Sequence, residues 1–115
     1  MWVFAKTGFV SIVQDAELKT WRVVRARVRG DLEAFCDLLP HGEERKKQIV
    51  VLSNRDYRYR VTLQRREVAA ALHNLAMQLD YGNFKESVHG DPDRDHAYMK
   101  CWAAMKDLQE KRRGR

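Results

Sequence analysis

Hydrophobic and polar residues alternate with a period of two in the first half of the chain, as they do in half-buried β-strands. Residues 2–5 and 9–13 are two short β-prone runs. The Lys6-Thr7-Gly8 segment between them predicts a tight hairpin turn, because glycine adopts positive φ without steric cost. A third strand is expected over residues 21–28, with apolar and cationic side chains on opposite faces: Val24, Ala26 and Val28 against Arg25, Arg27 and Arg29.

The same alternation returns at residues 57–64, which predict another strand. A shorter strand is expected before it, at residues 48–52, and the polar residues 41–47 are interpreted as an exposed connection. The aromatic and apolar side chains of the longer strand are expected on one face and the polar ones on the other: Tyr57, Tyr59, Val61 and Leu63 against Arg58, Arg60, Thr62 and Gln64.

Three segments have the three- and four-residue spacing of amphipathic helices. The first runs over residues 32–39, with Asp31 as its N-cap and Pro40 as its end. The second covers residues 68–79 and ends near residues 81–82. The third begins at residues 91–93, where an N-cap aspartate precedes a proline at the first helical position. Its apolar stripe is expected to be buried: Ala97, Tyr98, Cys101, Trp102, Met105 and Leu108.

This order of elements predicts an α+β fold. An antiparallel sheet of about five strands with its helices on one face is the simplest arrangement that buries all the apolar stripes together. A ferredoxin-like topology is the preferred form. With 115 residues the chain has room for one core. We therefore expect a single domain over residues 1–110, followed by a basic tail at residues 111–115.

The formal net charge of +6 suggests an anionic partner, but the location of the charge matters more than its total. Lys111, Arg112, Arg113 and Arg115 supply four of these charges, leaving +2 for residues 1–110. Total charge is therefore a weak argument for nucleic acid. No apolar run approaches the ~20 residues that cross a bilayer, and the N-terminus lacks the features of a signal peptide, so we expect a cytoplasmic protein.

The sequence offers little support for metal binding or catalysis. Cys36 and Cys101 fall on or beside apolar helix faces and are expected to be reduced thiols in the core. The acidic residues 91–95 resemble the start of a calcium loop, but His96 and Trp102 stand where such a loop needs glycine and glutamate. Helix capping explains these acids better. Without a nucleophile motif or convincing carboxylate pair, we expect no metal, no cofactor and no enzymatic activity.

Several stretches resemble a family of small bacterial and phage-borne proteins without a characterised activity. They occur in the same order along nearly the whole chain: Met1 to Ser11, Val24 to Arg27, Asp56 to Arg60, Asp80 to Lys85, and Tyr98 through Trp102 to Met105. The resemblance implies one compact domain and carries no catalytic residues.

The arginines of the two alternating strands are the strongest functional feature. If the helices cover the apolar face, four guanidinium groups lie together on the open face: Arg25, Arg27, Arg58 and Arg60. Guanidinium groups suit phosphates because each makes a bidentate contact. An aromatic stacking surface is expected from Trp2, Phe4, Phe9 or Trp21. Two alternatives stay open: the arginines pair with acids across the sheet, or they form a solvated face.

Four further residues complete the candidate ligand-binding set. Lys6 lies in the predicted turn, where a plain hairpin explains the sequence better than a phosphate loop. Tyr81, Asn83 and Lys85 belong to an aromatic and polar segment between two helices that could line a pocket. Alternatively, Tyr81 and Phe84 seal the edge of the core and Asn83 caps a turn.

The sequence therefore favours a non-enzymatic binding protein that recognises a phosphate-bearing ligand, nucleic acid or nucleotide, through a basic sheet face. The alternative is a protein-interaction module in which the same arginines meet an acidic protein surface, such as a phage-encoded inhibitor of a host defence or nucleic-acid-handling complex. No membrane partner is expected. Homodimerisation stays open, because a small sheet leaves unpaired edges.

Overall fold

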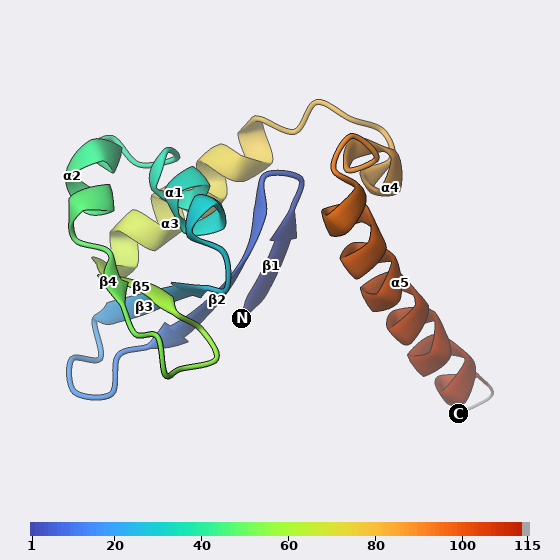
Figure 1. Ribbon diagram of the computed structural model, residues 1–115, viewed down its shortest axis with the longest axis horizontal. Coiled ribbons are helices and arrows are strands. Elements are labelled where there is room, and N and C mark those ends of the chain that lie inside the picture. Colours follow the sequence, from blue (N-terminus) through green and yellow to red (C-terminus); the bar gives the residue numbers. More distant parts are fainter. Residues whose placement is uncertain (114–115) are drawn as a thin grey trace. The chain divides into compact units, whose positions relative to one another are not determined.

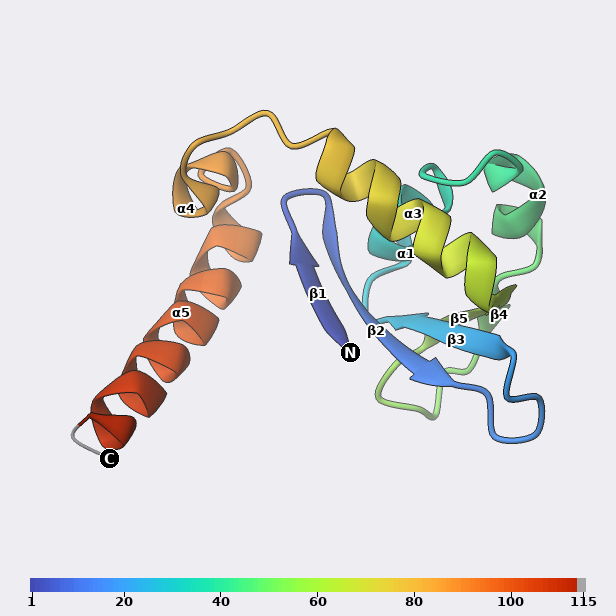
Figure 2. The same ribbon diagram turned by 180° about the vertical axis from the view of Figure 1, so that it is seen from behind.

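The chain divides into two compact units, Met1–Leu79 and Asp80–Arg115, and the computed structural model describes residues 1–113. The first unit holds a sheet and helices, and the second is helical (Figures 1 and 2). The elements are β1 (Trp2–Ala5), β2 (Gly8–Gln14), β3 (Trp21–Ala26), α1 (Arg29–Cys36), α2 (Gly42–Lys47), β4 (Val50–Val51), β5 (Tyr59–Gln64), α3 (Arg65–Met77), α4 (Phe84–Ser87) and α5 (Pro92–Arg112). The α+β class is confirmed, and the single domain over residues 1–110 stays a prediction.

The five strands form one antiparallel sheet in the order β1-β2-β3-β5-β4. The predicted hairpin is confirmed, since Ala5 pairs with Gly8 across the turn at Lys6 and Thr7. β3 and β5 are each two residues shorter than the alternation predicted: β3 ends at Ala26 and β5 begins at Tyr59. The strand order does not confirm a ferredoxin-like topology, which stays a prediction.

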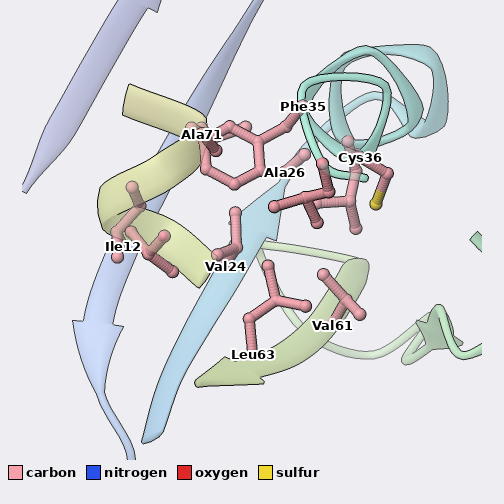
Figure 3. Close-up of a cluster of buried hydrophobic side chains, with 12 residues drawn as sticks. Ile12, Val24, Ala26, Phe35, Cys36, Val61, Leu63 and Ala71 are labelled. Carbon is pink, nitrogen blue, oxygen red and sulfur yellow. The ribbon is translucent and has the colours of Figure 1, made fainter. Parts of the chain in front are cut away.

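The core of the first unit lies between one face of the sheet and the helices α1 and α3 (Figure 3). Alternate residues of β2, β3 and β5 enter it, so the period of two sorts the side chains as predicted. The buried cluster comprises Val10, Ile12, Val24, Ala26, Val61 and Leu63 from the sheet, Leu32, Phe35, Cys36 and Leu39 from α1 and the turn after it, and Val68 and Ala71 from α3.

A buried carboxylate joins the β1–β2 hairpin to α1. Oδ2 of Asp31 accepts a hydrogen bond from the backbone N–H of Phe9 at 2.9 Å. Gly8 packs so closely against this side chain that a Cβ at position 8 would lie 2.7 Å from the Asp31 Cβ. Asp31 is therefore not the N-cap that the sequence predicted. α1 begins at Arg29, three residues before the predicted start, and places Asp31 in its first turn, where it makes a tertiary contact.

Residues 41–47, predicted to be an exposed connection, are largely exposed, but residues 42–47 form the helix α2. Acidic residues lie in its first turn and basic residues in its last, the order that the helix dipole favours. The Nζ of Lys46 lies 2.5 Å from Asp37 and 2.9 Å from Glu43, and hydrogen bonds to these carboxylates raise the pKa of Lys46. This helix has no apolar stripe, which is the pattern that predicts the longer helices, and Gly42 is its only buried residue.

The start of α5 is as predicted. The side chain of Asp91 accepts a hydrogen bond from the backbone N–H of Arg94 at 3.2 Å, and Pro92 is the first helical residue. The helix continues through Arg112, so the predicted tail at residues 111–115 begins as helix, and Arg115 lies outside the described residues. Within residues 1–113, no helix combines the length and the apolar composition needed to span a bilayer.

Within the second unit, α5 does not have the buried stripe that the sequence predicted. Only Tyr98 of this helix is buried, and its ring stacks on Phe84 of α4 with the centroids 5.7 Å apart. Trp102 is 46% exposed, and Met105 and Leu108 are exposed as well. Helical spacing identifies the apolar side of a helix, but it does not show whether another element covers that side.

Gly8→Ala is expected to destabilise the protein by roughly 1–3 kcal/mol, because the added methyl group overlaps Asp31. Gly30→Ala is the matched control. It lies in α1 with nothing within 4 Å of an added Cβ, and alanine is the better helix former, so a gain of up to ~1 kcal/mol is expected. Urea unfolding measures both free energies. An unchanged midpoint for Gly8→Ala would contradict the close packing at Asp31.

The two cysteines are both free and are expected to differ in reactivity. Burial raises the pKa of the Cys36 thiol to about 11, whereas Cys101 is only half-buried. Because the thiolate is the reactive form, iodoacetamide at about pH 8 should label Cys101 well before Cys36 in the folded protein. Because the pKa of Cys36 is higher in the folded than in the unfolded protein, its neutral thiol contributes fully to the free energy of unfolding below the unfolded pKa. This contribution is lost as the pH rises through the folded pKa. Peptide mass mapping identifies the labelled residue, and equal rates would contradict the burial of Cys36.

Candidate nucleic-acid interface

The register of β3 places its arginines on the sheet face opposite the core. Arg25 pairs with Ser11 of β2 on one side and with Arg60 of β5 on the other. Directly paired residues point to the same face, and the residue before Arg25, Val24, is fully buried in the core. Arg25 and Arg60 therefore share the opposite face, as predicted. We call it the outer face: Trp2, Phe4, Phe9, Ser11, Arg25 and Arg60 of the sheet, with Arg27 and Tyr57 beside them.

Three of the four predicted arginines meet at Tyr57. The guanidinium carbons of Arg25 and Arg27 lie 4.6 and 4.5 Å from the centroid of its ring. Nε of Arg60 donates a hydrogen bond to the backbone carbonyl of Tyr57 at 3.2 Å. Arg58 precedes the first residue of β5, and its side chain is exposed. The alternation thus brought together the right arginines, but the residue that holds them was assigned to the wrong face.

Tyr57 does not lie with Tyr59 on the core face, as the sequence predicted. Its ring contacts Phe9, an outer-face residue, with the centroids 6.4 Å apart, and it carries the guanidinium groups described above. The side chain is nonetheless buried, since the arginines and Phe9 cover it. The strand begins only at Tyr59, so the period of two does not extend back to position 57.

Arg25 is held in place without a carboxylate. Its Nη2 donates a hydrogen bond to Oγ of Ser11 at 2.7 Å, and its buried Nε has no hydrogen-bond partner within residues 1–113. Nη1 of Arg27 donates to the backbone carbonyl of Asp56 at 3.2 Å. Across the described part of the chain, none of the four predicted arginines forms an ion pair. The alternative that they pair with acids across the sheet is therefore wrong.

Aromatic rings continue the outer face from Tyr57 towards the edge strand β1. Phe4 and Phe9 are paired residues, and their rings stack with the centroids 4.5 Å apart. Trp2 meets Phe9 edge to face at 6.2 Å and is 67% exposed. Trp21, the fourth aromatic candidate, pairs with Gln64 at the other end of β3 and stands apart from this row. Three of the four predicted aromatic residues therefore adjoin the arginines.

The remaining candidates do not join this group within the first unit. Lys6 lies in the hairpin turn and already has an interaction partner. Tyr81, Asn83 and Lys85 belong to the second unit. There Asn83 caps α4 by accepting from the backbone N–H of Glu86 at 3.3 Å, which is the capping role considered from the sequence.

The side chains near α4 form a small aromatic cluster. The ring of Tyr81 lies 5.9 Å from that of Phe84, centroid to centroid, and Nζ of Lys85 lies 4.5 Å from the centroid of the Trp102 ring. Lys106 approaches the same indole at 5.6 Å. These contacts favour a local packing role for the segment, and a ligand-binding role stays a prediction.

Sequence reasoning missed Ser11 as a support for Arg25. The signal was present: once the hairpin turn is placed at Lys6 and Thr7, the alternation in β2 puts Phe9 and Ser11 on the face away from Val10 and Ile12. The pairing of Ser11 with Arg25 could not be read from that pattern, because it depends on the register between β2 and β3.

No group of three or more histidine, cysteine, aspartate or glutamate side chains in residues 1–113 is placed to hold a metal ion. No protein-family model, curated protein or solved structure matches this chain. The resemblance to small bacterial and phage-borne proteins therefore stays a prediction, and the chemistry of the outer face is the basis for a functional assignment.

Proposed function

We propose that the outer face binds the phosphate groups of a nucleic acid or nucleotide, as a binding protein and not as an enzyme. The observation that carries this proposal is the convergence of three guanidinium groups on Tyr57 with no carboxylate among their partners. A phosphate offers the paired acceptor oxygens that the donors of a guanidinium group match.

Arg25 supports the proposal most directly. Ser11 and the ring of Tyr57 hold its guanidinium group, and a neutral hydroxyl and a ring leave the positive charge uncompensated. A partly buried charge without a counter-ion loses hydration without gaining an ion pair. An anion on the outer face would supply the missing ion pair, whereas a purely structural arginine would be more stable opposite an acid.

Arg27→Glu and Arg60→Glu are expected to weaken binding by on the order of 10- to 100-fold, the effect of losing one hydrogen bond to a charged group. Isothermal titration with an oligonucleotide and with ATP measures the affinity of each variant. Lys47→Glu is the control, because it makes the same change in net charge at an exposed position of α2. Thermal unfolding should remain cooperative in all three proteins, since none of these side chains belongs to the buried core.

Three outcomes would contradict the proposal. An equal loss of affinity in Lys47→Glu would reduce the effect to overall charge. Polyglutamate bound as tightly as the oligonucleotide and ATP would favour an acidic protein surface as the partner. No binding of either phosphate ligand by the wild-type protein would remove the basis of the assignment.

A further inference from the structure

The aromatic row of the outer face is exposed at its β1 end, at Trp2 and Phe4, and it ends at the buried ring of Tyr57. Trp2 is 67% exposed and Phe4 is 36% exposed, and neither belongs to the buried cluster between the sheet and the helices. Leaving an indole in water forgoes the free energy that its burial would provide. The row therefore has the character of a contact surface.

Rings and guanidinium groups occur together on this face. From β1 inwards the order is Trp2, Phe9 and then Tyr57, whose ring carries Arg25 and Arg27. A ligand that satisfies both kinds of group needs flat apolar rings and anionic groups at a short, regular spacing. A nucleotide chain has this composition, since each unit joins one base to one phosphate.

We infer that the outer face binds single-stranded nucleic acid, with bases stacked at the exposed β1 end of the row, at Trp2, and phosphates on the arginines around Tyr57; this inference rests on the proposed function. In a duplex, the faces of the bases are stacked on one another, so that only edges and phosphates are accessible. Unstacked bases of a single strand present their faces to aromatic side chains and to arginine planes.

The length of the row favours an oligonucleotide over a mononucleotide. The ring centroids of Trp2 and Phe9 are 6.2 Å apart, and those of Phe9 and Tyr57 are 6.4 Å apart. Exposed Trp2 and the arginines on the buried ring of Tyr57 thus lie at opposite ends of the row, with Phe9 between them. A single nucleotide does not place its base at one end and its phosphate at the other. Successive nucleotides of one strand would contact rings and guanidinium groups in turn.

The test compares probes that share phosphates but differ in their bases. Fluorescence anisotropy is measured with a labelled oligothymidine of about ten nucleotides, within the range of known single-strand site sizes. The comparison probes are an abasic strand of the same length, a duplex of the same length and thymidine monophosphate. The oligothymidine is expected to bind tightest, followed by the abasic strand and the duplex. The logarithm of its association constant should fall linearly with the logarithm of the salt concentration, with a slope of about −0.7 for each phosphate contacted.

Trp2→Ala separates stacking from charge. It should weaken oligothymidine binding by on the order of 10- to 100-fold, the range for loss of one stacked base, and leave the abasic strand unaffected. Arg27→Glu should weaken both. Trp102→Ala is the matched control, an exposed tryptophan in the second unit, and should change neither affinity. The double variant Trp21→Phe/Trp102→Phe retains Trp2 as its single tryptophan out of three. Binding of oligothymidine to this variant should quench the fluorescence of Trp2.

Equal affinity for the oligothymidine and the abasic strand would overturn the inference while leaving the proposed phosphate site intact. Equal or tighter binding of the duplex, or of thymidine monophosphate, would overturn it in the same way. Absence of binding to all four probes would overturn both this inference and the function on which it rests. Unfolding midpoints of Trp2→Ala and the wild type should agree, which excludes a loss of affinity caused by misfolding.

Discussion

The pairing of β3 with β5 in one register determines both the core and the outer face. Val24 lies opposite Val61 and enters the core, while Arg25 lies opposite Arg60 and points away from it. Because successive side chains of a strand alternate between faces, a shift of one residue in both strands would exchange these sets. Guanidinium groups would then be buried without partners, at a cost of several kcal/mol for each charge. The register that the core demands therefore also concentrates positive charge on one face.

This concentration of positive charge on the outer face lowers the stability of the sheet. Like charges directly opposite each other on neighbouring strands destabilise a sheet, and Arg25 and Arg60 are such a pair. A carboxylate in place of Ser11 would offset the repulsion, since position 11 is the other cross-strand neighbour of Arg25. The chain has a hydroxyl there, and it has the ring of Tyr57 as the second support. Local arrangements that give up stability in this way are expected at functional sites, where a ligand supplies the missing interaction.

Sequence reasoning succeeded where one short-range pattern determines the structure, and failed where a distant contact does. The alternation around Arg25 and Arg60 was enough to predict their common face, and Asp91 followed by proline was enough to place the start of α5. Asp31 looked like a helix cap, but the hairpin packs against α1 and claims its carboxylate. Tyr57 was assigned by extending a period of two beyond the strand. The stripe around Trp102 has helical spacing, yet it contains no information about whether another element covers it.

Net charge is a poor guide to this site because it weights every cation equally. Lys111 and Arg112 at the end of α5 are exposed, and a ligand that bound them would have to immobilise long side chains, at ~0.5–1.5 kcal/mol for each one. Arg25 and Arg27 are already placed against the ring of Tyr57. A phosphate on the outer face, as proposed, would thus meet donors whose positions are fixed before it binds. The same number of charges gives tighter and more selective binding when folding has already ordered them, so the contacts of Tyr57 say more about function than the formal charge of +6.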